Sequence, residues 1–213
     1  MKTLVVVQAR MGSSRLPGKV LLPLAGRPLL ERMLQRLQGA RLRFDLCVAT
    51  STAVEDEPIR QLCQRIGVPV VGGHPTDLLE RHLLAAERLG ADVVVKVPSD
   101  CPLIDPAVVD EVLGYFAHNR ERFDFVTNLH PPTWPDGNDV EVMSRSVLSL
   151  AAKEARRPFE REHTTPFIWD NPQRFRIGNV RWRDGRDLSK THRFTVDYAE
   201  DYQFITRVYE ELC

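Results

Sequence analysis

Four short apolar runs alternate with helix-like segments through the first half of the chain, and this alternation constrains the fold more than any other feature. The runs cover Thr3–Gln8, Phe44–Thr50, Val68–Val71 and Asp92–Val97. Between them, apolar residues recur at helical spacing over Pro28–Leu37, Glu57–Ile66 and a segment that Thr76 is suited to cap, ending at Leu89. Such alternation predicts right-handed crossovers and a largely parallel sheet covered by helices on both sides.

The second half of the chain has a different pattern. Strands are expected over Asp124–Asn128, Val140–Met143, Phe175–Trp182 and Arg193–Val196, and helices from Asp105-Pro106 and over Ser146–Ala155, Arg161–Trp169 and Ala199–Leu212. The alternation in Val140–Met143 is typical of a half-exposed strand. We therefore expect an α/β fold with a mixed, mostly parallel central sheet, in one domain over residues 1–213. Residues 130–145, which begin with a proline-rich loop, are expected to leave the main sheet as a hairpin or dimerisation arm.

Composition narrows the classes of ligand. The 29 basic and 29 acidic residues balance to a formal net charge of zero, which argues against a nucleic acid as the main ligand. No apolar stretch approaches the length of a membrane span. The cysteines are scattered, at Cys47, Cys63, Cys101 and Cys213. Their spacing suits neither a zinc site nor a disulfide scaffold, so we expect reduced thiols in a cytoplasmic protein.

The loop after the first strand carries the strongest local signal. It reads Q-A-R-M-G-S-S-R-L-P-G-K from Gln8 to Lys19 and offers two glycines, two hydroxyls and three cations. These groups suit a triphosphate, and ligands of open α/β sheets bind beyond the carboxyl ends of strands. Gly12 and Gly18 are one residue too far apart for a Walker A loop, and Val20 replaces its Ser or Thr. The alternative interpretation is a solvated surface loop.

Two aspartates follow expected strands. Asp100 comes directly after the fourth apolar run, and Asp197 lies at the end of Arg193–Val196. Mg²⁺ is commonly held by one or two carboxylates together with substrate phosphates, so the pair forms a candidate magnesium site. Taken singly, Asp100 is equally explained as a turn residue and Asp197 as a helix N-cap.

Five segments, taken in order, resemble the cytidylyltransferase superfamily. They read A-R-M-G-S-S-R-L-P-G-K, S-D-C-P-L-I-D-P, P-D-G-N-D-V-E-V, R-E-H-T-T-P-F-I and T-V-D-Y-A-E-D-Y, and they extend from the first loop to Tyr202. The sequence is most similar to the branch named for spore-coat polysaccharide biosynthesis protein F, and more distantly to enzymes that make CMP-Kdo and CMP-sialic acid. The resemblance implies a Rossmann-like three-layer nucleotidyltransferase fold.

The resemblance also implies residue roles. The backbone of Ala9 and Arg10 would meet the base, near Thr76 and Asp77. The full nucleotide-binding set would be Ala9, Arg10, Gly12, Ser13, Ser14, Arg15, Lys19, Thr76, Asp77 and Ser99, and the metal ligands would be Asp100 and Asp197. In the related branches, Q-G-D or T-G-D stands where this chain has Pro98-Ser99-Asp100, a departure that bears on cytosine selection.

The acceptor side is less defined by the sequence. Shared segments contain Asn128, Asp139, Glu141, Arg161 and His163, and His163 is either a sugar-orienting base or a structural residue. A basic cluster comprises Arg174, Arg176, Arg181, Arg183, Arg186, Lys190 and Arg193. This cluster is explained either as a solvated face or as a contact for an acidic sugar or a partner subunit.

We therefore expect a Mg²⁺-dependent cytidylyltransferase that joins CMP from CTP to an oxygen of an acidic sugar for surface polysaccharide synthesis. Lys19, Arg15 and Arg10 would be the catalytic cations, with charge on the departing pyrophosphate neutralised by Lys19 and Arg15. A homodimer is expected, with no nucleic acid or membrane partner. The alternatives are a sugar-1-phosphate nucleotidyltransferase, a glycosyltransferase that binds a nucleotide sugar, and a binding module without activity. The D-x-D triplet typical of such glycosyltransferases is missing after the fourth apolar run.

Overall fold

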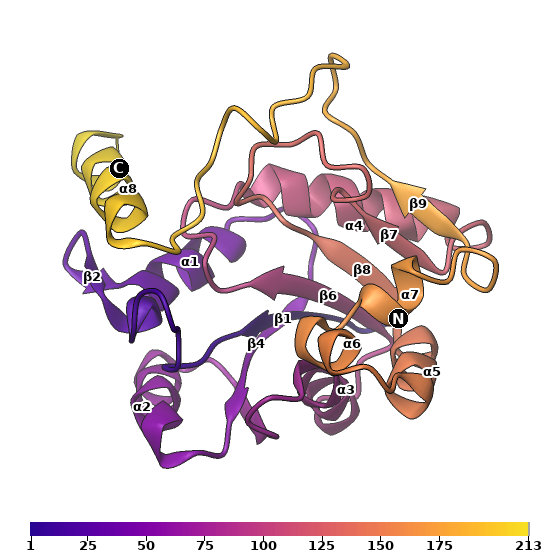
Figure 1. Cartoon of the computed structure of the whole chain (residues 1–213), viewed down its shortest axis with the longest axis horizontal. Helices are drawn as coiled ribbons and strands as arrows, with labels where there is room; N and C mark the ends of the chain where they lie inside the picture. The colour runs from indigo at the N-terminus through magenta and orange to yellow at the C-terminus, as the bar shows by residue number, and fades with distance from the viewer. Residues whose placement is uncertain (213) are drawn as a thin grey trace.

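A seven-stranded sheet forms the centre of the computed structural model, which describes residues 1–212 (Figure 1). Its order is β5-β4-β1-β6-β8-β7-β9. The strands are β1 (Thr3–Gln8), β4 (Asp45–Ser51), β5 (Val70–Gly73), β6 (Val93–Pro98), β7 (Phe125–Thr127), β8 (Glu141–Ser144) and β9 (Ile177–Asn179). All neighbouring strands are parallel except β8, which is antiparallel to both β6 and β7. The predicted mixed, mostly parallel sheet is confirmed.

Helices cover both faces of this sheet because the side chains of β1 alternate between them. Val5 and Val7 belong to one apolar cluster, and Leu4 and Val6 to a second. The first cluster includes buried residues of α1 (Leu29–Leu37), α2 (Glu57–Ile66) and α4 (Pro106–Asn119), and the second those of α3 (Leu78–Arg88), α5 (Arg145–Glu154) and α7 (Pro166–Trp169). Figure 1 shows α4 above the sheet and α3 and α5 below it.

The remaining elements lie around the edge where the first loop ends. They are the 3-10 helices η1 (Lys19–Leu21) and η2 (Val54–Asp56), the hairpin of β2 (Pro23–Leu24) and β3 (Arg27–Pro28), and the helices α6 (Pro158–His163) and α8 (Ala199–Leu212). A third apolar cluster joins Leu24 and Leu29 to Ile205 of α8. The C-terminal helix thus packs beside the N-terminal hairpin. No helix within residues 1–212 has the length and apolarity needed to cross a bilayer.

The placement of β8 corrects two predictions. We expected a half-exposed strand within an arm that leaves the sheet, but β8 pairs with β6 and β7 in its interior. Val142 and Met143 are fully buried. The polar residue of the alternating pattern, Glu141, is also buried, because its cross-strand neighbour Lys96 forms an ion pair with it. A buried charge with an ion-pair partner produces the same alternation of apolar and polar residues as a strand with one face in solvent.

Three predicted elements differ in extent. The helix expected over Arg161–Trp169 is divided into α6 and α7 at Thr164, whose φ is 75°. Only the centre of Phe175–Trp182 pairs, as β9. The strand expected over Arg193–Val196 is wrong, since its ladder contact is one isolated bridge between Arg193 and Asp136.

The cap of α3 also differs from the prediction. Thr76 was the expected cap, but the side chain of Asp77 accepts the hydrogen bond from the backbone N–H of Glu80, at 2.9 Å. Thr76 instead contacts the ring of His74. An aspartate one residue further along satisfies the same exposed N–H group at the helix start.

Candidate active site

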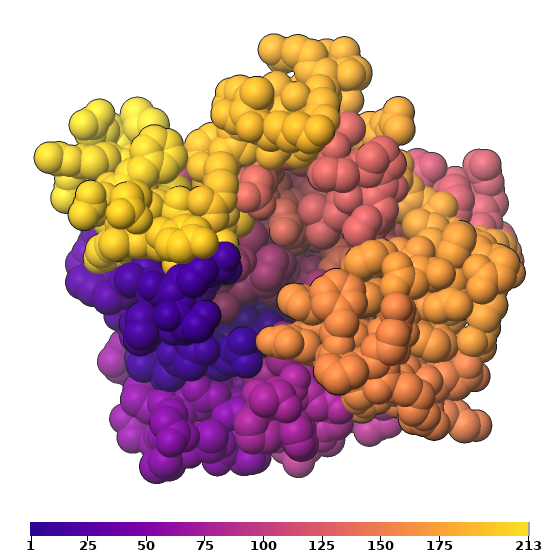
Figure 2. All heavy atoms as spheres, viewed as in Figure 1, coloured from indigo at the N-terminus to yellow at the C-terminus, as the bar shows by residue number. Residues whose placement is uncertain are grey.

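A cavity of about 290 Å³ lies at the carboxyl ends of β1 and β6. Figure 2 shows the surface hollowed between indigo N-terminal atoms, orange atoms of the α6 region and yellow C-terminal atoms. Nine predicted site residues line this cavity: Arg10, Ser13, Ser14, Arg15, Lys19, Ser99, Asp100, His163 and Asp197. The fold therefore brings the first loop and both candidate metal aspartates to one place.

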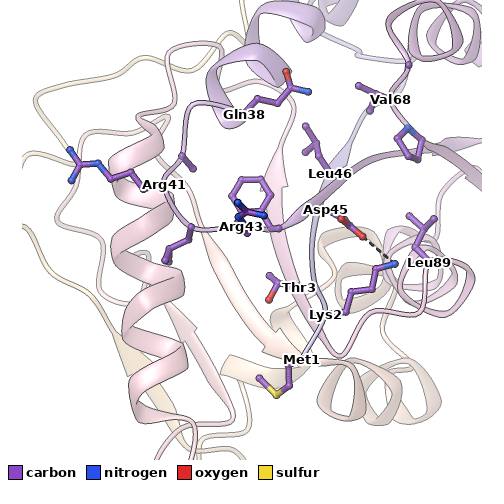
Figure 3. A pocket seen from close by; sticks show the side chains of 15 residues that line it. Met1, Lys2, Thr3, Gln38, Arg41, Arg43, Asp45, Leu46, Val68 and Leu89 are labelled. Atoms are coloured by element: carbon purple, nitrogen blue, oxygen red, sulfur yellow. Dashed lines mark ion pairs between the residues drawn. The ribbon is translucent and has the colours of Figure 1, made fainter.

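A larger cavity, of about 970 Å³, lies at the amino ends of β1 and β4 (Figure 3). Its walls include Lys2, Arg41 and Arg43, and an ion pair joins Lys2 to Asp45 at 3.1 Å. It contains none of the predicted site residues. Because ligands of such sheets bind at the carboxyl ends of the strands, we place the site in the smaller cavity.

Lys19 is the cation at the centre of the site. Gly18 precedes it in a left-handed conformation, with φ 69°, and η1 begins at Lys19 itself. The ammonium donates to the carbonyl oxygen of Val196 at 2.7 Å, to Oδ1 of Asp197 at 3.0 Å and to Oδ2 of Asp100 at 3.4 Å. One ammonium therefore joins the two aspartates that were predicted to share a metal ion.

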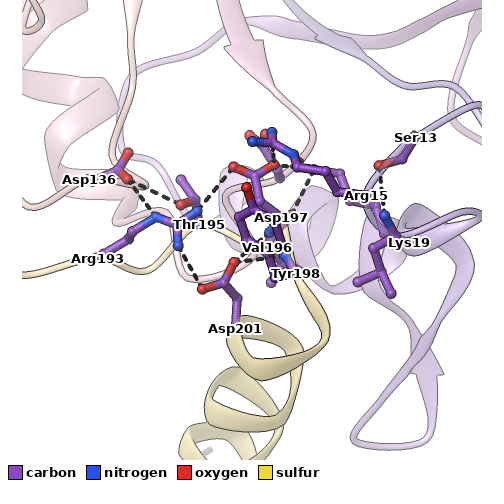
Figure 4. Close-up of polar contacts among 12 residues, drawn as sticks. Ser13, Arg15, Lys19, Asp136, Arg193, Thr195, Val196, Asp197, Tyr198 and Asp201 are labelled. Atoms are coloured by element: carbon purple, nitrogen blue, oxygen red, sulfur yellow. Dashed lines mark hydrogen bonds and ion pairs between the residues drawn. The ribbon is translucent and has the colours of Figure 1, made fainter.

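Asp197 is paired through both of its carboxylate oxygens (Figure 4). Oδ1 also contacts Arg15 at 2.8 Å, and Oδ2 contacts Arg193 at 3.0 Å. Burial alone would raise the pKa of Asp197, but the contacts with these cations outweigh it and hold the pKa below its usual value. The backbone N–H groups of Asp197 and Tyr198 both donate to Asp201, so the side chain of Asp197 remains directed to the cavity.

Arg193 is a functional candidate that the sequence did not single out. Besides Asp197, its guanidinium contacts Asp201 at 2.7 Å and Asp136 at 3.3 Å. Asp136 also accepts a hydrogen bond from Thr195. Arg193 therefore fastens the segment before α8 to the loop after β7. Its position four residues before Asp197 was the available sequence signal, but it was grouped with the other basic residues nearby.

Asp100 follows β6 and faces the same cavity. Its carboxylate contacts Lys19 and accepts from the Cys101 thiol at 3.5 Å. The backbone N–H of Val196 donates to the carbonyl oxygen of Asp100 at 2.8 Å, which ties the two aspartate-bearing segments together. The side chain of Asp100 therefore lines the cavity, which its interpretation as a turn residue alone does not explain.

Asp56, at the end of η2, anchors the first loop from below. It accepts from the backbone N–H of Met11 at 2.7 Å and from both the backbone and hydroxyl of Ser51. Burial raises the pKa of Asp56, but these hydrogen bonds together lower it by more, so the pKa is below its usual value. The loop is therefore held by a charged group that the sequence pattern did not reveal.

Several predicted nucleotide contacts lie outside the cavity lining. The N–H of Ala9 donates to the carbonyl of Ala49 at 3.0 Å, so it is already used within the sheet. Asp77 caps α3 and forms an ion pair with Arg161, which was predicted on the acceptor side. Gly12 is exposed, and a Cβ built on it meets nothing within 4 Å. The contacts of Asp77 and Arg161 join α3 to α6.

Of the residues predicted on the acceptor side, only His163 lines the cavity. Asn128 is fully buried and uses its amide to hold Asn138 and Val140. Glu141 accepts from the hydroxyl of Thr165 at 2.9 Å and pairs with Lys96.

Lys96 also lines the cavity, as His163 does, and was missed because a single lysine within an apolar run gives no sign of facing a site. Asp139 lies outside the lining. Burial, with added repulsion from Asp136 and Asp100, raises the pKa of Asp139 to about 7.

Arg81 of α3 was also missed. Its side chain is fully buried, and Nη2 donates to the carbonyl of Pro75 at 3.3 Å. Its Nε and Nη1 atoms have no hydrogen-bond partner within residues 1–212. Burial first, and then the charge of Arg10, lowers the pKa of Arg81 to about 10. The helical pattern showed where Arg81 lies on α3 but not that its charge is enclosed.

The donor set fits magnesium only together with a ligand. Within the described part of the chain, no three His, Cys, Asp or Glu side chains are grouped to hold a metal ion. Asp100 and Asp197 are nevertheless close enough to share the ammonium of Lys19. Two carboxylates suffice for Mg²⁺ when phosphates and water complete its octahedron.

Comparison with known proteins places the chain among nucleotidyltransferases. A family described as Cytidylyltransferase matches residues 4–212. The spore coat polysaccharide biosynthesis protein SpsF of Bacillus subtilis is 30% identical over 213 residues, covering 98% of this chain and 86% of that protein. The 3-deoxy-manno-octulosonate cytidylyltransferase of Geobacter sulfurreducens is 34% identical over 121 residues, covering 56% of this chain and 47% of that protein.

A solved structure agrees with this placement over the whole chain. The cytidylyltransferase of Leptospira borgpetersenii serovar Hardjo-bovis superposes with a TM-score of 0.94 at 34% identity, covering 100% of this chain and 88% of that one. The three-layer arrangement implied by the sequence resemblance is thus the arrangement of a solved cytidylyltransferase.

Proposed function

Because the chain belongs to the cytidylyltransferase family, we propose that it transfers CMP from CTP to an oxygen of an acidic sugar, with Mg²⁺ as cofactor and pyrophosphate as the second product. The observation that carries the proposal is the contact of Lys19 with both Asp100 and Asp197 beside a loop with two further cations. Charged groups converge there at a strand-end cavity, as phosphoryl transfer requires.

The cations of the first loop bind and orient the triphosphate. Arg10 and Arg15 line the cavity with Lys19, and the hydroxyls of Ser13 and Ser14 lie between them in sequence. Lys19 and Arg15 neutralise charge on the departing pyrophosphate, so their contacts strengthen as the bond to the α-phosphorus breaks.

Asp100 and Asp197 would bind the metal, and the cations around Asp197 keep that carboxyl ionised. Asp197 has a lowered pKa because of its cations, so it is a carboxylate at neutral pH. Mg²⁺, when bound, would screen the phosphate charges and lower the pKa of the acceptor hydroxyl. Arg193 lies behind Asp197 and holds the oxygen that faces away from Lys19.

The charges on the acceptor side favour a sugar hydroxyl over a sugar phosphate. Lys96 already pairs with Glu141, and Arg10 lies 3.6 Å from Glu162. Lys96 donates to Glu141 and Thr165, which leaves its ammonium one N–H group, enough for one carboxylate oxygen and too few for a dianionic phosphate. We therefore place the carboxylate of the sugar near Lys96 and His163. The name of the Bacillus subtilis relative refers to a spore coat polysaccharide, and that of the Geobacter sulfurreducens relative to 3-deoxy-manno-octulosonate; both support a sugar of this kind as acceptor.

The proposal extends to setting and assembly. We propose that the enzyme is cytoplasmic, because its thiols at Cys47, Cys63 and Cys101 are free. We also propose that it acts as a homodimer, as is expected for relatives of this family.

A pyrophosphate-release screen tests the function. The protein is incubated with Mg²⁺, each of the four nucleoside triphosphates, and a panel of 3-deoxy-manno-octulosonate, nonulosonic acids and sugar 1-phosphates. We expect release with CTP and a carboxylated sugar, and a product whose mass equals the sugar plus CMP less water. Turnover confined to another nucleotide or to sugar phosphates would contradict the proposal.

A further inference from the structure

The ammonium of Lys19 has no N–H group left for a phosphate. Its three donors are matched by three acceptors, namely the carbonyl of Val196 and the carboxylates of Asp197 and Asp100. A lysine ammonium has three donors and no more. The side chain is 11% exposed, so these contacts are shielded from solvent. Lys19 must therefore exchange partners when a triphosphate enters.

Arg15 also forms an ion pair with Asp197. It contacts Oδ1 at 2.8 Å, and its guanidinium carbon lies 5.1 Å from the centre of the Tyr198 ring. Oδ1 of Asp197 thus carries two cations, while Oδ2 carries Arg193 (Figure 4). Basic side chains of the chain itself therefore already pair with both carboxylates.

We propose that Lys19 competes with a divalent cation for Asp100 and Asp197 in the nucleotide-free protein. The position that bridges the two carboxylates is the position of its ammonium, at 3.4 and 3.0 Å. Metal then binds well only when phosphates draw Lys19 away, so nucleotide precedes metal or arrives with it. This inference rests on the proposed function, since it takes the aspartates as metal ligands.

Coulomb's law gives the direction of the effect. A unit charge within 3 to 4 Å of two carboxylates, shielded from water, strongly disfavours a second cation at the same place. Removing the ammonium while keeping a similar chain length takes the cation from Asp100 and one of three cations from Asp197, which keeps Arg15 and Arg193. We expect the affinity of the nucleotide-free protein for a divalent ion to rise at least tenfold.

The test titrates the protein with Mn²⁺ in the absence of nucleotide and acceptor. Electron paramagnetic resonance measures how much of the Mn²⁺ is bound. Wild type should bind weakly, and Lys19→Met at least tenfold more tightly. Lys153→Met, the same change at an exposed residue of α5, should match wild type. Lys19→Arg keeps the charge and should remain within about threefold of wild type. Adding Asp197→Asn to Lys19→Met should abolish the gain.

Two outcomes overturn the proposal: equal Mn²⁺ affinity in Lys19→Met and wild type, or a gain that survives Asp197→Asn. If Lys19→Met fails to fold by circular dichroism, Lys19→Gln keeps a donor for Val196 and takes its place. Mn²⁺ binding needs no turnover, so the outcome is separate from that of the proposed function. A chain that does not use CTP would still show the gain if the competition exists.

Discussion

The ammonium of Lys19 lies 3.0 Å from Oδ1 of Asp197, although 178 residues separate the two in the chain. One follows the first loop and the other precedes the last helix. They meet because β1 and β6 end at the same edge and Val196 is hydrogen-bonded to Asp100 there. The phosphate cation and the metal carboxylates of the proposed mechanism are therefore one charge network.

Replacing Lys19 by Ala should depress the maximal rate with CTP about a hundredfold or more, the scale of one lost electrostatic donor. CTP affinity should fall less, because Arg10, Arg15 and the loop remain. Steady-state kinetics and direct CTP titration on the same variant measure both quantities. Unaltered rate and binding would show that Lys19 does not act on the triphosphate.

Gly137→Ala should destabilise the protein by about 1–3 kcal/mol, the usual cost of a strained backbone. Gly137 has φ 103°, and a Cβ there would lie 2.9 Å from the carbonyl carbon of Phe194, in the segment that leads to Asp197. Gly114→Ala is the matched control. Within α4 its Cβ meets only Leu42, at 3.8 Å, so stability should rise by about 0.5–1 kcal/mol. Urea unfolding of both variants gives the comparison, and equal effects would contradict it.

His82 predicts a pH dependence of stability. Complete burial, aided by Lys96 and Arg81, lowers its pKa to about 3 in the folded protein, against 6.5 for the free side chain. The unfolded chain therefore binds an extra proton between these values. The unfolding free energy should fall as pH falls from about 6.5 toward 3, by up to about 1.4 kcal/mol per unit from this residue. The stability is fully present above pH 6.5.

His82→Gln checks this contribution. Gln does not titrate, so the slope of unfolding free energy against pH between 4 and 6 should be shallower than in wild type. Urea unfolding at pH 4, 5, 6 and 7.5 provides the slopes. Identical slopes would mean that other groups account for the whole dependence.

Dimerisation remains a prediction. Light scattering at micromolar protein should give twice the chain's mass, as for a symmetric pair. Because β8 lies within the sheet, residues 141–144 are excluded as a protruding arm, and any contact must use another surface. A monomeric mass under these conditions would remove the prediction.

The sequence predicted those parts of the fold that depend on local pattern. β1 and α2 have the predicted bounds, because a buried run and a helical stripe ending at Gly67 leave few alternatives. β8 and the segment before Asp197 were described wrongly. Their conformations depend on partners far away, Lys96 for Glu141 and the Asp136 loop for Arg193.

The candidate site, like the fold, was predicted only where local sequence carries the signal. Lys19, Asp100 and Asp197 were identifiable from residue type and from their place in the first loop or after an expected strand, and they do lie together, although the strand expected before Asp197 does not form. Arg193 and Arg81 were not, since the sequence shows neither the three carboxylates that contact Arg193 nor the burial of Arg81. Only the tertiary structure places their charges.

The most direct test is Mg²⁺-dependent pyrophosphate release from CTP by wild type, Asp100→Ala and Asp197→Ala, with the acceptor found in the screen. If both aspartates hold the metal, wild type turns over and neither variant exceeds background, with unchanged circular dichroism. A variant that keeps a near-normal, magnesium-dependent rate would show that its aspartate is not a metal ligand, and the proposed magnesium site would be wrong.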